Sequence, residues 1–205
     1  MPDKSVRIGG ASGYWGESAM ATPQLLGAGV DYLVYDYLAE ITMSIMARAH
    51  SKDPAAGFAG DFISAVLKPH ARAIAAQGVK VIANAGGVNP TACGEAARAL
   101  IREQGLALKV AVITGDNLLT ERDAIAEALA EGADIVITGR CVDSAVTLGA
   151  CIHEFGWLAD DFDRLASGSL AGHLLECGPQ ATGGNYTDWE EAGDIANIGY
   201  PIGTV

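Results

Sequence analysis

The sequence is poor in aromatic residues, in positive charge and in long apolar runs. Only 6% of its 205 residues are aromatic, and 13 Lys and Arg stand against 25 Asp and Glu, a formal net charge of −12. Nucleic acids and anionic membranes are bound through basic faces, so we expect neither among the partners. No stretch approaches the ~20 apolar residues of a bilayer span, and the first residues do not resemble a secretory signal. These absences predict a cytoplasmic protein.

Cysteine is also scarce, and its spacing lacks the common metal and redox motifs. The four cysteines are dispersed with no C-x-x-C pair, and the four histidines complete no zinc signature. We therefore expect thiols in a reducing compartment and assign no metal ligand. The cofactor stays unknown at this stage.

The remaining composition is that of a layered α/β protein. Half of the residues are hydrophobic and 26 are Gly, which excludes intrinsic disorder and suits tight strand–helix packing. Short β-branched runs alternate with helical spacing, the pattern of βαβ units on a parallel sheet. The runs are residues 6–8, 31–35, 79–83, 109–113 and 134–137. Glycines at 29, 78, 105 and 132 precede the later strands and are suited to ending the helices before them.

We therefore predict a single α/β domain over residues 1–205, with a doubly wound, mostly parallel, Rossmann-like sheet of at least five strands. Helices are expected at 144–153 and 163–177, the second broken near Ser167 and Gly168. A Gly-rich region from Gly178 is expected to fold back over the carboxyl edge of the sheet. The strand order stays open, and a partial (β/α) barrel is the alternative architecture.

Polar residues gather where the predicted strands end, which is the edge that binds ligands in parallel α/β sheets. Gly10, Ser12 and Gly13 follow the first strand, and Asp36 and Glu40 follow the second. The later strands are followed by a further set, Asn84, Asn89, Asp116, Arg140 and Asp143. We take these ten residues as the candidate site.

The four carboxylates of this set, Asp36, Glu40, Asp116 and Asp143, admit three interpretations. They are suitable ligands for Mg²⁺, they are suitable general acids or bases, and Asp at such junctions often caps the next helix. Arg140 either clamps a substrate carboxylate or phosphate by bidentate bonds or forms an internal ion pair with Asp143 or Asp116.

Residues 10–16 form a G-x-x-G-x-x-G turn that resembles the nucleotide loop of extended short-chain dehydrogenases. Asp36 lies 20 residues beyond Gly16, near the place of a ribose-binding acid. However, no Tyr is followed four positions later by Lys, so the catalytic pair of that family is missing. A tight turn that packs a helix on a strand is the alternative, and the one we favour.

Several strings together resemble the amino-terminal domain of the acyclic terpene utilisation protein family. They are IGGASGYWG at 8–16, DYLVYDYLAE at 31–40, NAGGVNP at 84–90, GADIVITGR at 132–140, GHLLEC at 172–177 and TGGN at 182–185. The resemblance implies a bacterial catabolic context, beside genes for acyl-CoA breakdown of citronellol- and geraniol-type terpenes, including a biotin-dependent acyl-CoA carboxylase. It supplies no catalytic residues.

The chain also departs from that family. Family members carry an extended insert after the fourth strand, whereas here the sequence passes from Leu119 directly to Thr120 and the next helix, and the family domain continues beyond Val205. We therefore expect a truncated or fragmentary domain that lacks the lid which the insert provides.

The functional hypothesis is an enzyme that acts on a small carboxylate or acyl-CoA thioester in terpene or branched-acid catabolism. Asp36 or Asp116 is the expected acid or base, Arg140 holds an anion, and Ser12, Asn84 and Asn89 hydrogen-bond the substrate. The apolar acyl chain is expected against Tyr14, Trp15 and the Gly-rich loops. A non-catalytic auxiliary subunit of an acyl-CoA carboxylase system and an NAD(P)-binding oxidoreductase are the alternatives. We also expect a homo-oligomer.

Overall fold

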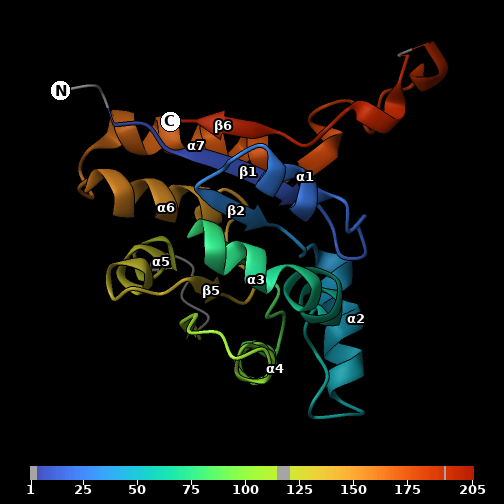
Figure 1. Cartoon of the computed structure of the whole chain (residues 1–205), viewed down its shortest axis with the longest axis vertical. Coiled ribbons are helices and arrows are strands. Elements are labelled where there is room, and N and C mark those ends of the chain that lie inside the picture. The colour runs from blue at the N-terminus through green and yellow to red at the C-terminus, as the bar shows by residue number, and fades with distance from the viewer. Residues whose placement is uncertain (1–3, 115–120, 192) are drawn as a thin grey trace.

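The computed structural model describes residues 4–114, 121–191 and 193–205, and it has an α/β fold with helices on both faces of one sheet (Figure 1). The sheet has six strands in the order β4-β5-β3-β2-β1-β6. The strands are β1 (Arg7–Ser12), β2 (Tyr32–Tyr35), β3 (Lys80–Ala83), β4 (Val110–Val112), β5 (Ile135–Ile137) and β6 (Ile202–Thr204). Strands β1 to β5 are parallel, and β6 pairs with β1 in the antiparallel sense.

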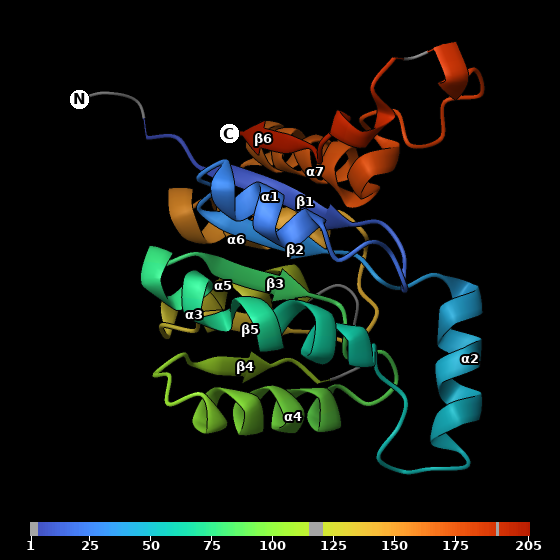
Figure 2. The ribbon, with the colours of Figure 1, turned by 45° about the vertical axis from the view of Figure 1, so that its right-hand side comes forward.

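The first face of the sheet is covered by the helices that connect β1, β2, β3 and β4. These are α1 (Ala21–Gly27), the π-helix η1 (Phe62–Leu67) with α3 (Lys68–Gln77), and α4 (Pro90–Glu103). Leu33 and Tyr35 of β2 point into this core, because successive side chains of a strand alternate between the faces. Helix α2 (Glu40–His50) instead stands across the carboxyl ends of the strands, as Figure 2 shows.

The second face is covered by the later helices, α5 (Glu121–Ala130), α6 (Ala145–Phe155) and α7 (Phe162–Glu176). Tyr32 and Val34 of β2 point into this second core, together with Val146 and Cys151 of α6. Because apolar side chains are buried on both faces, the sheet is doubly wound, and its strands read as near-continuous apolar runs. The predicted fold class is confirmed, and the partial barrel is wrong because β4 and β6 lie at opposite ends of an open sheet.

The predicted helix ends are also confirmed. Gly29, Gly78, Gly105 and Gly132 all have positive φ, between 68° and 86°. An L side chain is disfavoured in this left-handed region, so glycine ends each helix and turns the chain toward the next strand. A glycine at a helix end depends only on the residues next to it, so the ends of these helices can be predicted from the sequence.

Three details of the carboxyl-terminal part differ from prediction. Helix α7 runs unbroken through Gly168, whose missing Cβ makes room for the Trp157 ring, 2.7 Å from where a Cβ would lie. The Gly-rich region contacts β1 at its start, the 3₁₀ turn η2 (Gly178–Gln180), whereas residues 181–191 and 193–199 extend away from the body (Figure 2). Strand β6, which the sequence pattern did not predict, then pairs with β1 and becomes the outermost strand on that side of the sheet.

Candidate functional site

A large cavity among the described residues lies where the connections of two neighbouring strands lead to opposite faces of the sheet. Strand β3 leads to α4 on the first face, and its neighbour β5 leads to α6 on the second. Such a switch point opens a crevice outside the carboxyl ends of the strands, which is where α/β sheets bind their ligands. The cavity here has a volume of about 780 Å³. Its described lining comes from the loops after β3, β4 and β5 and from Met43 of α2.

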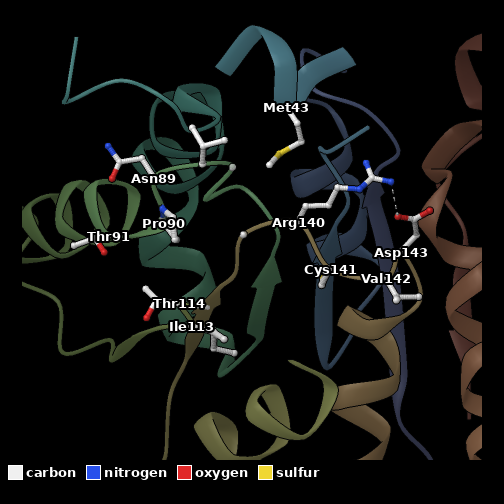
Figure 3. Close-up of a pocket in the computed structure, with 13 residues that line it drawn as sticks. Met43, Asn89, Pro90, Thr91, Ile113, Thr114, Arg140, Cys141, Val142 and Asp143 are labelled. Carbon is white, nitrogen blue, oxygen red and sulfur yellow. Dashed lines mark ion pairs between the residues drawn. The ribbon is translucent and has the colours of Figure 1, made fainter. Parts of the chain in front are cut away.

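The cavity is lined by charged, polar and apolar residues. Figure 3 shows Arg140 and Asp143 on one side and Pro90 and Thr91 at the start of α4 on the other. Apolar lining is supplied by Met43, Val88, Pro90, Ile113 and Val142. Pockets of this kind, with an apolar wall and a few convergent polar groups, suit a small organic molecule that carries a charged group.

The loop after β3 is shaped by close packing. A Cβ on Gly86 would lie 2.5 Å from the carbonyl oxygen of Thr138, and one on Gly87 would lie 2.4 Å from Met46 Sδ, so neither position has room for a side chain. Asn89 caps α4 by accepting from the Ala92 N–H, and its amide group donates to the carbonyl oxygens of Pro54 and Ala56. The Asn89 side chain therefore supports the cavity wall with bonds inside the protein.

Arg140 follows β5 and brings its guanidinium to the cavity wall. Nη1 donates to the carbonyl oxygen of Leu38, and Nη2 lies 3.3 Å from Glu40 Oε1 and 3.8 Å from Asp143 Oδ1. The side chain of Glu40 is 90% exposed, so solvent screens this pair. A guanidinium has five N–H donors, and these partners leave donors for a ligand anion. Arg140 therefore forms the predicted internal ion pair with Asp143 and also lines the cavity, where a ligand anion can reach it.

Asp36 is the most perturbed carboxyl among the described residues of this edge. It is 8% exposed, and its Oδ1 accepts hydrogen bonds from Asn84 Nδ2 and, at 3.3 Å, from the Leu38 N–H. Burial raises the pKa of Asp36 to about 6, helped by the nearby charge of Asp143 and opposed by the bond from Asn84. Asn84 is itself fully buried and accepts from the Tyr37 N–H at 2.7 Å, so it holds the Asp36 carboxyl in place.

Asp36, Asp143 and Glu176 form a carboxylate cluster. One oxygen of each lies within 4.8 Å of the others, although the three residues come from the loops after β2 and β5 and from the end of α7. Burial raises the pKa of Glu176, and the charge of Asp143 adds to this effect. A proton or a divalent cation on the cluster relieves the mutual repulsion. The capping interpretation is wrong for Asp36 and Asp143, because the N-cap residues of α2 and α6 are Ala39 and Ser144.

The glycine turn after β1 is used for packing. A Cβ on Gly10 would lie 2.2 Å from the carbonyl oxygen of Leu175, and one on Gly13 would lie 2.6 Å from that of Cys177. The Gly13 N–H, which a nucleotide phosphate would need, donates to Glu17 Oε2 at 2.7 Å. A carboxylate of the chain itself thus occupies the anion position of the turn, which supports the favoured packing interpretation.

The structure brings most of the predicted site residues to one edge, at different distances from the cavity. Asn89, Arg140 and Asp143 line it, Glu40 pairs with Arg140, and Asp36 with Asn84 lies behind Asp143. Gly10, Ser12 and Gly13 lie farther along the edge, where the Ser12 hydroxyl donates to the carbonyl oxygen of Tyr14. Tyr14 and Trp15 are not part of the described lining. Asp116, Leu119 and Thr120 lie outside the described residues.

Sequence reasoning missed Glu176 and the cavity residues Met43, Thr91 and Thr114. Glu176 lies between His173 and Cys177 near the end of α7, and its carboxylate meets His173 Nδ1 at 2.9 Å. The i, i+3 spacing of His173 and Glu176 on a helix indicates that these two side chains are neighbours. Nothing local to residue 176 indicated that the end of α7 reaches Asp36.

Within the described parts of the chain, no helix combines the length and the apolar character needed to cross a bilayer.

Comparison with known proteins gives one match. A search of curated proteins and a search of solved structures gave no match. The family model described as acyclic terpene utilisation family protein AtuA matches residues 6–124 and 122–205. With nearly the whole length matched, and with the six strings noted above, the chain belongs to the acyclic terpene utilisation family.

Proposed function

We propose that this chain is an enzyme of acyclic terpene and branched acyl-CoA breakdown that acts on a small carboxylate or an acyl-CoA thioester. Membership of the family implies a role in acyclic terpene utilisation. The proposal adds a site, the cavity between the loops after β3 and β5, and a reaction class, proton transfer to or from a bound acyl compound.

The observation that carries the proposal is that Arg140 and Asp143 line one crevice and that Asp143 lies beside Asp36, whose pKa is about 6. A substrate carboxylate or thioester carbonyl accepts hydrogen bonds from the Arg140 guanidinium and displaces the exposed Glu40 side chain from it. The apolar part of the substrate lies against Met43, Val88 and Ile113. This assignment places the acyl chain in the cavity, away from Tyr14 and Trp15.

Proton transfer falls to the carboxylate cluster. With a pKa of about 6, Asp36 is present in both protonation states near neutral pH, which suits a general acid or base. Asp143 lines the cavity and lies next to Asp36, so it connects the buried carboxyl with the bound substrate. Asn84 is a positioning residue, because its amide fixes the orientation of the Asp36 carboxyl.

The test measures binding and stability with defined ligands. Branched carboxylates and their CoA esters are expected to raise the melting temperature of the native protein, because a ligand that binds only the folded state stabilises it. Arg140→Ala is expected to weaken carboxylate binding by roughly tenfold to a hundredfold in calorimetry, the effect of about 1.5–3 kcal/mol for a hydrogen bond to a charged group.

Arg48→Ala is the matched control, because it removes the same charge from the exposed surface of α2. Unchanged affinity in Arg140→Ala would contradict the role of this residue. Stabilisation by NADH or NADPH, with none by acyl compounds, would favour the oxidoreductase. Recovery of a carboxylase from a lysate, with no small-molecule response, would favour the auxiliary subunit.

A further inference from the structure

The carboxyl edge of the sheet has very little positive charge. The five connections that follow the parallel strands span residues 13–20, 36–39, 84–89, 113–120 and 138–144. Arg140 is the one Lys or Arg in their sequence, which also holds Glu17, Asp36, Asp116 and Asp143. Arg140 is likewise the one basic side chain in the described lining of the cavity. A ligand that enters here therefore meets a single cation among several carboxylates.

Coenzyme A requires the opposite environment where its phosphates bind. It carries a diphosphate and a phosphate monoester, and the monoester alone has about 1.5 to 2 negative charges near neutral pH. Proteins bind such groups through Lys and Arg side chains and through backbone N–H groups at helix starts or glycine turns. An acyl-CoA substrate therefore needs donors of these kinds at the cavity or beside it.

The helix that starts at the cavity has few free donors. Helix α4 begins with Pro90, which has no N–H, and the Ala92 N–H donates to the side-chain oxygen of Asn89. The Cys93 N–H donates to the backbone oxygen of Asn89. Among the first four residues of α4, Thr91 is left with an N–H that none of these bonds uses. The start of α4 is therefore a weak place for a phosphate.

The glycine turn and the nearest other cations do not replace these donors. The Gly13 N–H already donates to Glu17 Oε2 at 2.7 Å, so a phosphate there would lie against a carboxylate. Arg48 and Lys52 are exposed at the end of α2 and just beyond it, whereas α2 contributes Met43, near its start, to the described lining. The described lining thus offers the phosphates of coenzyme A no second cation.

A small free carboxylate fits the charge of this site better. Glu40 Oε1 lies 3.3 Å from Arg140 Nη2, so a carboxylate of the chain already occupies the position that a ligand carboxylate would take. Glu40 is three residues before Met43 on α2, and Met43 extends into the cavity (Figure 3). The Glu40 side chain is 90% exposed and can turn to solvent. A ligand carboxylate replaces its charge at Arg140, whereas a neutral thioester carbonyl does not.

We propose that the cavity binds a free branched carboxylate in preference to its coenzyme A ester, and that Glu40 competes with the ligand for Arg140. This inference rests on the function proposed above and selects one of its two substrate classes. The ligand carboxylate takes the place of the Glu40 carboxylate, and the branched tail lies against Met43, Val88 and Ile113.

The first test compares a free acid with its own ester. Calorimetric titration of the full chain with isovalerate and with isovaleryl-CoA gives both dissociation constants under the same conditions. We expect the free acid to bind at least tenfold more tightly than the ester, and coenzyme A alone to show no binding. An ester that binds as tightly as the acid would overturn this inference and leave the proposed function standing. Binding of neither compound would contradict the proposed function, and this inference with it.

Substitution of Glu40 tests the competition at Arg140. Glu40→Gln removes the competing charge and is expected to tighten isovalerate binding about threefold, the effect of an exposed ion pair. Glu40→Lys adds a second cation and is expected to narrow the preference for the acid over the ester. Glu103→Gln is the matched control, because it makes the same change on the exposed end of α4, ~20 Å from the cavity at 1.5 Å per residue. Isovalerate binding that is the same in Glu40→Gln and Glu103→Gln would overturn the role of Glu40.

Discussion

Carboxylates at the amino edge of the sheet, where the parallel strands begin, are paired with cations, whereas those at the carboxyl edge, where the strands end, lie close to one another. At the amino edge, Lys80 Nζ lies 2.6 Å from Asp134 Oδ1 and Lys4 Nζ lies 2.7 Å from Glu154 Oε2, so each carboxylate has a cation. At the carboxyl edge, Asp36, Asp143 and Glu176 converge within 4.8 Å. The basic side chains near this cluster are Arg140, whose Nη2 lies 3.8 Å from Asp143 Oδ1, and His173, whose Nδ1 lies 2.9 Å from Glu176 Oε1.

The pKa values record this difference. Although burial by itself raises the pKa of Glu154, hydrogen bonds from Lys4 and Tyr32 hold it below its usual value. Burial raises the pKa of Asp36 to about 6, and the neighbouring carboxylates add to the shift. Charge at the amino edge therefore stabilises the fold, whereas charge at the carboxyl edge costs stability, as is common where ligands bind.

The largest expected effect on stability comes from a substitution that forces β1 away from the end of α7. Gly10→Ala puts a Cβ 2.2 Å from the carbonyl oxygen of Leu175, so β1 and the end of α7 have to move apart. We expect a loss of about 3 kcal/mol in the free energy of unfolding, measured by urea denaturation. Gly27→Ala is the control, because that helical position is open and the substitution is expected to be neutral or stabilising. Equal effects of the two substitutions would contradict this account of β1.

A smaller effect is expected from removing one charge of the carboxylate cluster. The folded pKa of Asp36 is above the ordinary value of 3.8, so the folded protein binds the proton more tightly than the unfolded chain. The stability of the wild type is therefore expected to fall as the pH rises from 4 to 6, and to stay low above that range. Asp36→Asn should remove this dependence and stabilise the protein by roughly 2 kcal/mol at pH 8.

Denaturation at pH 4 and at pH 8 measures this difference. At pH 4 the wild type and Asp36→Asn are expected to be nearly equal, because the wild-type carboxyl is then protonated. A variant that is less stable than the wild type at pH 8 would show that the Asp36 charge is compensated in the protein.

The smallest effect is expected at the amino edge, and it has the opposite sign. Glu154→Gln removes the charge that Lys4 and Tyr32 bind, and we expect a loss of about 1 kcal/mol at pH 7. Because the folded pKa of Glu154 is below 4.5, the loss should shrink as the pH falls through that folded value. If this acid-to-amide change stabilised the protein as Asp36→Asn does, the contrast between the edges would be lost.

The strands and the residues that follow them were predictable because their signals are local. Apolar runs, glycines at helix ends, and polar residues such as Asp36 and Arg140 after each strand all lie within a few positions of one another. The cavity at β3 and β5 was not predictable, because it depends on β5 inserting between β3 and β4. The same applies to β6, whose pairing with β1 spans the whole chain.

The sequence by itself determined the fold class, the family and the edge at which to look for a site. Each of these depends on short-range patterns that hold in any arrangement of the strands. Only the tertiary structure decided that Glu176 joins Asp36 and Asp143, that Glu17 occupies the glycine turn, and that α7 presents a second apolar face. The first of these outcomes depends on the end of α7 packing against β1, a contact between segments more than 160 residues apart in the chain.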